Sequence, residues 1–316
     1  MAATARLAER ARGIAHPNPG IAALIVKEDR VIGRGWTQSG GRPHAEADAL
    51  DGLSADALRG STLYVTLEPC AHVSERGPAC ADLVSTAKPA RVVIGQHDPD
   101  PRTAGSGIAR LEAAGIAVCV LEDKASARSI PGYLMRMREG RPYVTLKLAQ
   151  SLDGCIALAD GTSQWITGEP ARAHCHAQRA RNEAILVGGG TWRADRPRLN
   201  VRLPGLAERS PQRVLLTRGA APEGIRTINH PEQIADLDGV LHLYVEGGAE
   251  AAASFLKADL VDELHLYQAP IVIGDGLRSI GALGLTDLAS AHGRWRSIEQ
   301  RMLGSDRFTA YLRTRS

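Results

Sequence analysis

The stretch that decides the fold of the first half of the chain begins with Pro43-His44-Ala45-Glu46. It continues with Glu68-Pro69-Cys70 and, after nine further residues, Cys80. A catalytic zinc ion takes three protein ligands and keeps one position open. Activation of water at that position also needs a carboxylate that moves protons. His44, Cys70 and Cys80 offer one nitrogen and two thiolates, and Glu46 offers the carboxylate.

This order of residues is typical of zinc nucleobase deaminases, which carry a His-x-Glu followed by a Pro-Cys and a second cysteine. The alternative is that the cysteines are small buried hydrophobic residues and that Pro43-His44 only starts a helix. Four matching residues in the same order favour the zinc site. The nine residues between the cysteines, in place of two, indicate a particular branch of these enzymes.

Composition sets the broad class of the protein. The chain has 316 residues, enough for two domains, with 44% hydrophobic and 23% charged residues, as in a soluble globular protein. A net charge of +3 without a block of basic residues does not indicate a nucleic-acid partner. With no secretion signal and no apolar run of membrane-spanning length, we expect a cytoplasmic protein with no membrane partner.

The remaining cysteines do not indicate a disulfide framework. Cys119, Cys155 and Cys175 are scattered and odd in number, so we expect ordinary thiols.

The first half alternates strands with helices. We expect strands at Ile21–Lys27, Val31–Trp36 and Leu63–Leu67, a helix from Pro43 to Leu50, and another helix directly after Cys70. A single helix over Ala125–Arg138 closes the unit. This alternation predicts an α/β sandwich around a mostly parallel sheet. Gly140 and Pro142 mark a boundary, which predicts domains 1–140 and 141–316.

The second half starts again with an expected strand at Tyr143–Gln150 and a turn at Ser151–Gly154. Two glycine-rich strand-to-helix turns follow, Gly188–Thr191 and Glu246–Gly248. Such turns let backbone N–H groups approach a phosphate, although many bind no ligand. Neither turn is a G-x-G-x-x-G dinucleotide fingerprint. The residues alone therefore predict an α/β nucleotide-binding domain with an unspecified ligand.

Across both halves the chain resembles the family of bifunctional riboflavin biosynthesis proteins, which join a pyrimidine deaminase to a pyrimidine reductase. The resemblance covers almost the whole chain and rests on the order of six motifs: His16-Pro17-Asn18-Pro19, Pro43–Glu46, Cys70 with a long gap to Cys80, Lys147–Gly154, Ser163–Gly168 and Glu246–Gly248.

The resemblance implies a cytidine-deaminase-like α/β/α sandwich followed by a dihydrofolate-reductase-like α/β domain. The first would use zinc to remove the 2-amino group of 2,5-diamino-6-(5-phosphoribosylamino)pyrimidin-4(3H)-one. The second would use NADPH to reduce the ribosyl group to a ribityl chain. The implied partners are this small phosphorylated pyrimidine and further copies of the chain in a homo-oligomer.

The resemblance also implies roles for single residues. In the deaminase half Glu46 would be the catalytic proton carrier, His44, Cys70 and Cys80 the zinc ligands, and Asn18 and His72 substrate-binding residues. In the reductase half the implied NADPH-binding residues are Ala149, Trp165, Thr191, Asp195 and Gly248. The implied substrate-binding residues are Ser163, Arg179, Leu199, Arg202 and Glu246, with the two arginines suited to the phosphate.

Several positions depart from the family's usual pattern. The segment Cys70–Cys80 is one residue longer than usual and lacks a Thr-Pro-Pro sequence. Thr37 stands where a histidine is common, Arg196 replaces an aspartate and Asn200 replaces a threonine. None removes a metal ligand or Glu46. We therefore expect differences in substrate contacts and no change in the type of reaction.

Three alternatives remain open at this point. The chain could be another zinc deaminase, acting on cytidine, guanine or tRNA, with a reductase-like half that is inactive or used differently. It could be a zinc-stabilised scaffold without activity, although the intact His44, Glu46, Cys70 and Cys80 speak against this. Finally, a working deaminase could be joined to a reductase half that no longer binds NADPH.

Overall fold

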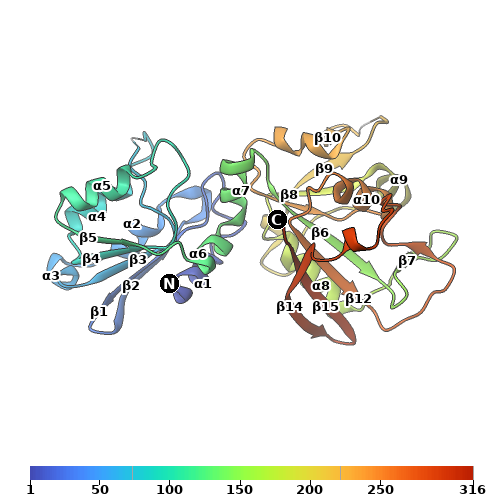
Figure 1. Cartoon of the computed structure of the whole chain (residues 1–316), viewed down its shortest axis with the longest axis horizontal. Helices are drawn as coiled ribbons and strands as arrows, with labels where there is room; N and C mark the ends of the chain where they lie inside the picture. The colour runs from blue at the N-terminus through green and yellow to red at the C-terminus, as the bar shows by residue number, and fades with distance from the viewer. Residues whose placement is uncertain (73, 221, 316) are drawn as a thin grey trace. The chain divides into compact units, whose positions relative to one another are not determined.

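The structure, a computed structural model, describes residues 1–72, 74–220 and 222–315. The chain divides into two units, Met1–Gly140 and Arg141–Ser316, and each contains its own sheet with helices on both faces (Figure 1). The predicted α/β fold class is therefore confirmed. Within the described ranges, no helix combines the length and the apolar character needed to cross a lipid bilayer.

The first unit is built on a five-stranded sheet in the order β2-β1-β3-β4-β5. Its strands are β1 (Ala22–Lys27), β2 (Arg30–Trp36), β3 (Thr62–Val65), β4 (Arg91–Ile94) and β5 (Ala117–Val120). The sheet is mixed, because β1 runs antiparallel to both β2 and β3. Strands β3, β4 and β5 pair in parallel, and β2 points in the same direction as they do, so the sheet is mostly parallel, as expected. The hairpin turn has positive φ at Glu28 and Asp29, a geometry that matches the twist of antiparallel strands.

Helices cover both faces of this sheet. They are α1 (Ala2–Ala8), η1 (Ser39–Gly41), α2 (Ala45–Leu50), α3 (Ala55–Leu58), α4 (Cys80–Ala87), α5 (Ser106–Ala113), α6 (Lys124–Ser129) and α7 (Pro131–Glu139). Helices α2, α4 and α5 lie on one face, and α1 and α6 lie on the other (Figure 1). Ala49, Val84 and Leu111 of the first group pack on Ile25 and Val92 of the sheet, all nearly inaccessible to solvent.

Three predicted helices differ from the structure. The helix predicted over Ala125–Arg138 is two helices, because Ile130 leaves the helical region before Pro131, as residues preceding proline commonly do. Among the described residues between Cys70 and α4 there is no helix, and Ser74 pairs with Gly77 in an isolated bridge. Helix α2 starts at Ala45, so that His44 is its N-cap and does not lie in its first turn.

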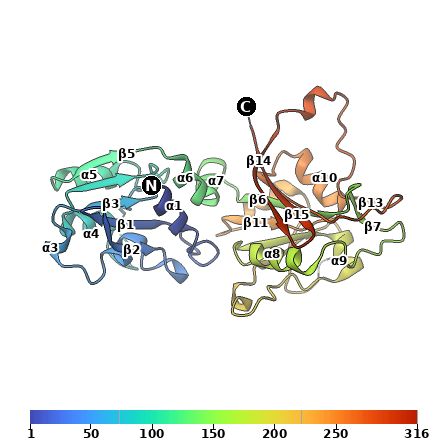
Figure 2. The same cartoon turned by 90° about the horizontal axis from the view of Figure 1, so that it is seen from below.

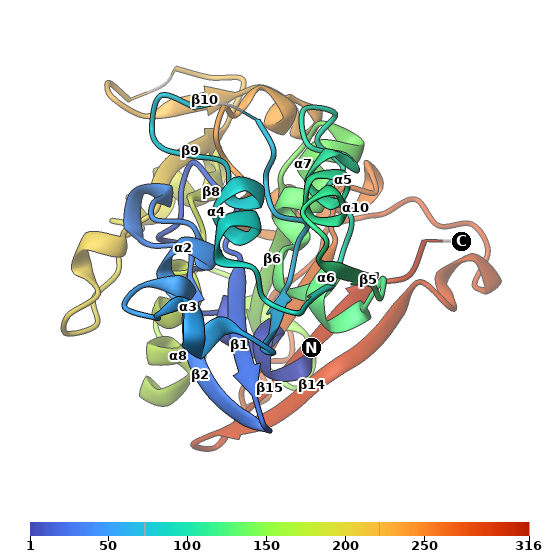
Figure 3. The same cartoon turned by 90° about the vertical axis from the view of Figure 1, so that its left-hand side faces the viewer.

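The second unit contains an eight-stranded sheet in the order β10-β9-β8-β11-β6-β12-β15-β14. Its strands are β6 (Tyr143–Gln150), β8 (Ala184–Gly188), β9 (Gln212–Leu216), β10 (Arg226–Ile228), β11 (His242–Val245), β12 (Glu263–Gln268), β14 (Trp295–Leu303) and β15 (Asp306–Arg313). The first six in spatial order are parallel, and β15 and β14 add an antiparallel hairpin at one edge (Figure 3). A separate small sheet pairs β7 (Cys155–Ala157) with β13 (Leu277–Arg278).

Helices also cover both faces of the second sheet, α8 and α9 on one side and α10 on the other (Figure 2). They are α8 (Glu169–Arg179), α9 (Gly189–Asp195) and α10 (Ala249–Lys257), with the short helices η2 (Ala207–Arg209), η3 (Pro231–Asp236) and η4 (Ala289–Ala291). Strand β8 shows why both faces are covered. Ile185 packs with Ala171 of α8, whereas Leu186 packs with Phe255 of α10, as expected for successive side chains on opposite faces of a strand.

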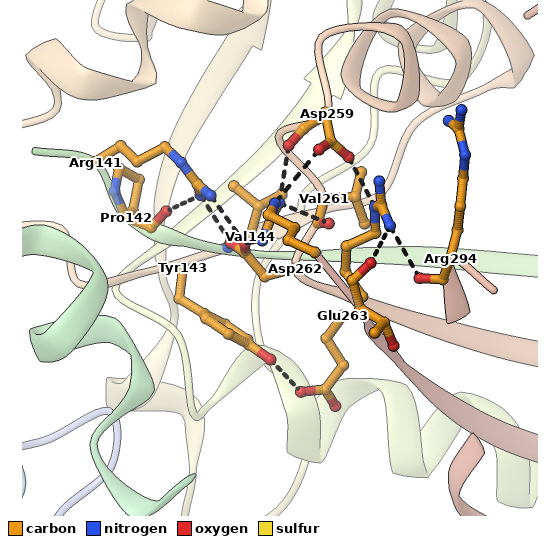
Figure 4. A network of polar contacts seen from close by, with 12 residues as sticks. Arg141, Pro142, Tyr143, Val144, Asp259, Val261, Asp262, Glu263 and Arg294 are labelled. Carbon is orange, nitrogen blue, oxygen red and sulfur yellow. Dashed lines mark hydrogen bonds and ion pairs between the residues drawn. The ribbon is translucent and has the colours of Figure 1, made fainter. Parts of the chain in front are cut away.

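A buried carboxylate fixes the beginning of the second unit. Asp262, 2% exposed, accepts hydrogen bonds from both terminal nitrogens of Arg141 at 2.7 and 2.9 Å. It also accepts one from the backbone N–H of Val144 and one from Arg315. Figure 4 shows these contacts around the start of β6. Asp262 therefore holds the start of strand β6 in place, with hydrogen bonds to both of its carboxylate oxygens.

We predict that Asp262→Ala lowers the free energy of unfolding by about 3–5 kcal/mol, because it removes the buried acid that binds the largely buried Arg141 guanidinium and the N–H of Val144. Urea unfolding measures the change, and Asp238→Ala, an exposed acid of the same unit, is the matched control. A loss no larger than in the control would show that Asp262 does not anchor this segment.

Candidate active sites

Three segments bring the predicted zinc ligands together. His44 caps α2, Cys70 lies in the irregular segment after β3, and Cys80 is the first residue of α4. The Nδ1 atom of His44 lies 3.2 Å from the sulfur of Cys80 and 3.6 Å from that of Cys70. Tetrahedral zinc with bonds of about 2.0 Å to nitrogen and 2.3 Å to sulfur separates such ligands by about 3.5 Å. The donor types and their spacing therefore fit zinc.

The two thiols influence each other. The hydrogen bond from Cys80 to Cys70 lowers the pKa of the Cys70 thiol to about 4 and leaves the pKa of Cys80 raised. The backbone N–H of Cys80 also points at the Cys70 sulfur, 3.3 Å away. Cys70 is thus prepared as a thiolate, the form that binds a metal.

Glu46 lies in the first turn of α2 and is 3% exposed. Burial, helped by the negative charge of Cys70, raises the pKa of its carboxyl group from 4.5 to about 7. A proton carrier works best when its pKa is close to the working pH. The side chain therefore has both the position and the proton affinity for acid–base work beside the ligands.

Asn18 approaches the opposite side of the His44 ring. Its Nδ2 atom lies 2.8 Å from Nε2 of His44 and donates to the carbonyl of Gly41 at 3.0 Å. If Nδ1 binds a metal, Nε2 carries the ring proton, and the Asn18 amide would accept it through its oxygen and so fix the direction of the ring. Asn18, predicted as a substrate-binding residue, thus also orients His44.

A cavity of about 230 Å³ opens over these residues. Asn18, His44, Glu46, Cys70 and His72 line it, and Cys80 lies buried next to it. Sequence reasoning missed five further residues of the wall: Arg42, Asp98, Asp100, Arg102 and Tyr133.

One of these omissions had a signal in the sequence. Asp98-Pro99-Asp100-Pro101 follows β4, and ligands of α/β sheets bind outside the carboxyl ends of parallel strands. Tyr133 comes from α7 and had no such signal. Its hydroxyl donates to Asp98 at 2.6 Å, and burial raises the pKa of that aspartate.

The second unit contains a cavity of about 360 Å³ at the ends of β6, β8 and β11. All ten residues that the resemblance implied for this half line it. They are Ala149, Ser163, Trp165, Arg179, Thr191, Asp195, Leu199, Arg202, Glu246 and Gly248.

Glycines shape the wall of this cavity. A side chain on Gly247 would place its Cβ 2.6 Å from that of Ala251, so only glycine lets the end of β11 approach α10 so closely. The next residue, Gly248, caps α10 and donates its N–H to Thr191 at 3.2 Å. Around Gly190 the space is open. A glycine-lined wall at the start of a helix fits the diphosphate of a nicotinamide cofactor.

A buried ion pair forms the charged centre of the cavity. Arg179 donates to both carboxylate oxygens of Glu246, at 2.6 and 2.9 Å, and Lys147 lies 3.8 Å from the same group. Burial alone would raise the pKa of Glu246, but the two positive charges outweigh it and lower the pKa to about 2.

The two arginines implied for the phosphate differ in availability. Arg179 is committed to Glu246 and to the carbonyl of Asn200. Among the described residues, the Arg202 side chain makes one contact, at 3.3 Å to Asn200, and is otherwise available to a ligand.

Trp165 is 63% exposed at the edge of the cavity. The guanidinium of Arg172, which sequence reasoning missed, lies 4.8 Å from the centre of its ring. This cation–π contact keeps a large exposed aromatic ring at the cavity edge.

Together, the two sites define a class of protein, a zinc-dependent deaminase joined to a nicotinamide-dependent reductase. Comparisons with known families agree with this class. Residues 1–96 match the cytidine and deoxycytidylate deaminase zinc-binding region, and residues 142–303 match the RibD C-terminal domain.

Relatives with both parts in one chain identify the family. The riboflavin biosynthesis protein RibD of Escherichia coli is 37% identical over 97% of this chain and 96% of its own length. That of Bacillus amyloliquefaciens is 40% identical over 86% and 84%. The chain belongs to the RibD family.

Solved structures extend the similarity to the fold. Acinetobacter baumannii RibD superposes with a TM-score of 0.87 at 32% identity, covering 99% of this chain and 97% of that one. A deaminase/reductase from Thermotoga maritima superposes with a TM-score of 0.86 at 28% identity and covers 99% and 97%. The protein is a bifunctional deaminase and reductase of riboflavin biosynthesis, and its cofactors are zinc and NADPH.

We predict that Cys80→Ser removes bound zinc, because a buried thiolate ligand is lost. The loss of affinity should exceed the 10- to 100-fold that removal of an outer-shell partner typically costs. Metal analysis after dialysis measures it, with Cys119→Ser as the control, since Cys119 lies in β5 outside the ligand set. Full zinc content in Cys80→Ser would contradict the ligand assignment.

A second prediction concerns pH. Because the pKa of Glu246 is lowered to about 2 in the folded protein, its ion pair should stabilise fully above about pH 4.5 and lose this effect as the pH falls toward 2. Urea unfolding of wild type and Glu246→Gln should therefore differ by a constant free energy above about pH 5 and converge below it. A difference that does not change with pH would refute the charge assignment.

Proposed function

We propose that residues 1–140 hydrolyse the 2-amino group of 2,5-diamino-6-(5-phosphoribosylamino)pyrimidin-4(3H)-one. Residues 141–316 then use NADPH to reduce the ribosyl group of the product to a ribityl chain. The observation that carries this proposal is the presence of both sites in one chain, His44, Cys70 and Cys80 around Glu46 and a second cavity around Glu246. The similar Thermotoga maritima protein is named for the same pair of activities.

In the deaminase site, zinc held by His44, Cys70 and Cys80 would supply Lewis-acid activation of a water molecule. Glu46 would accept a proton as the water oxygen bonds to the carbon that carries the 2-amino group, and would deliver it to that amine as the C–N bond breaks and ammonia leaves. Asn18 and His72 line the same cavity and hold the pyrimidine.

In the reductase site, NADPH supplies a hydride, and the protein contributes orientation. Gly248, Thr191, Asp195, Ala149 and Trp165 hold the cofactor against the sheet. Ser163, Leu199 and Arg202 hold the substrate, with the Arg202 guanidinium on its phosphate. Arg179 keeps the carboxylate of Glu246 in place beside the ribose, through the pair of hydrogen bonds described above. The proposal extends to a cytoplasmic homo-oligomer, as the family resemblance implies.

The proposal is tested by incubating the zinc-loaded protein with the pyrimidine precursor, with and without NADPH. We expect ammonia release in both cases and oxidation of NADPH only after deamination has begun. Free cytidine, guanine and tRNA are the comparison substrates. Turnover of one of these, with none of the precursor, would replace the proposal with that of another zinc deaminase.

We predict that Glu46→Gln retains zinc but lowers the deamination rate by about 10²–10⁴-fold, the usual contribution of a positioned acid–base group. The reductase activity of the same variant, measured on the deaminated intermediate, serves as the internal control. Deamination at the wild-type rate would mean that another group carries the proton.

A further inference from the structure

Arg42 occupies an unusual position in the deaminase cavity. It lies two residues before His44, is half-buried and lines the cavity wall. Among the residues that the structure describes, it has no hydrogen-bond or ion-pair partner. The guanidinium of Arg76, in the segment Cys70–Cys80, lines the same wall and among the described residues donates to the carbonyl of Gly40, at 2.6 Å. Two guanidinium groups therefore face one cavity without a counter-charge from the described part of the chain.

The acids of this cavity are already engaged elsewhere. Asp100 is paired with Arg102, and Asp98 accepts from the hydroxyl of Tyr133. Glu68, 2% exposed, accepts from the backbone N–H groups at the start of α5. Glu46 faces the zinc ligands. The positive charge of Arg42 and Arg76 is thus not neutralised within the cavity, which makes this wall suited to an anion.

The Arg42 side chain lies close against Gly77 of the segment Cys70–Cys80. A Cβ atom built on Gly77 would lie only 2.8 Å from its Nη1 atom, and Gly77 has a φ of +138°. Glycine at this position therefore leaves the space that the guanidinium occupies. A half-buried arginine at a cavity wall, with no acid bound to it among the described residues, is positioned for a ligand that brings its own negative charge.

We propose that Arg42 binds the phosphate of the deaminase substrate, beside Arg76, and makes the deaminase selective for the phosphorylated pyrimidine. This inference rests on the proposed function of the deaminase half. The planar guanidinium group offers two parallel N–H donors that match a phosphate, and a half-buried site screens their charge less than open solvent does. Arg42 contributes to binding of the substrate's phosphate and takes no part in the proton transfers of Glu46.

The experiment measures ammonia release from the phosphorylated precursor and from the corresponding riboside without phosphate. Arg42→Gln and Arg42→Lys are compared with wild type and with Arg59→Gln, a control that removes an 83% exposed arginine outside the cavity. For Arg42→Gln we expect KM for the phosphorylated substrate to rise about 10-fold or more, as for loss of a charged hydrogen bond. The kcat and all values for the riboside should stay close to wild type.

Two further readouts separate binding from structure. Inorganic phosphate should inhibit wild-type turnover of the precursor competitively, and more weakly in Arg42→Gln, with Arg42→Lys in between. Zinc content and the midpoint of thermal unfolding should match those of Arg59→Gln. If Arg42→Gln does not fold, the comparison of Arg42→Lys with wild type gives the same answer.

The inference is overturned if Arg42→Gln affects both substrates equally, or neither, while the wild-type enzyme prefers the phosphorylated one. It is also overturned if phosphate inhibits wild type and variant to the same extent. Failure of the proposed function looks different, since wild-type protein with full zinc would then release no ammonia from the precursor at all.

Discussion

The first unit depends on the meeting of His44, Cys70 and Cys80 at one point. These residues come from the cap of α2, the irregular segment after β3 and the start of α4, so a shared metal would tie together three segments that the sheet alone leaves separate. The same convergence surrounds Glu46 with sulfur and apolar atoms, and this burial raises its proton affinity. The meeting of His44, Cys70 and Cys80 thus both forms the ligand set and raises the pKa of Glu46.

In the second unit, positively charged side chains surround the buried carboxylate at the centre of the site. Glu246 stands at the end of the buried strand β11, and its carboxylate is tolerable there only because Arg179 and Lys147 approach it. The ion pair in turn fixes the position of groups that face the cavity. Both halves of the enzyme therefore place a carboxylate at low exposure and set its proton affinity through its neighbours, raised in Glu46 and lowered in Glu246.

Much of this could be predicted from the sequence, and the remainder depended on contacts that a sequence does not show. Strand β6 was predicted at its observed bounds, because apolar residues recur along Tyr143–Gln150 with the period of two that is typical of a strand. Strand β14 was missed, since it lies at the sheet edge and is exposed along most of its length. The zinc ligands His44, Cys70 and Cys80 could be predicted because only a few residue types bind zinc. Tyr133 could not, because only tertiary packing brings α7 to the cavity, and Arg42, although two residues before His44, belongs to no motif that marks it as a site residue.

The most direct test of the zinc site is X-ray absorption spectroscopy at the zinc edge on the purified protein. We expect one zinc per chain with two sulfur neighbours at about 2.3 Å and two nitrogen or oxygen neighbours at about 2.0 Å, one of them from solvent. Absence of tightly bound zinc, or a shell of four sulfurs, would contradict this, because His44 and an open position beside Glu46 would then not belong to the metal site.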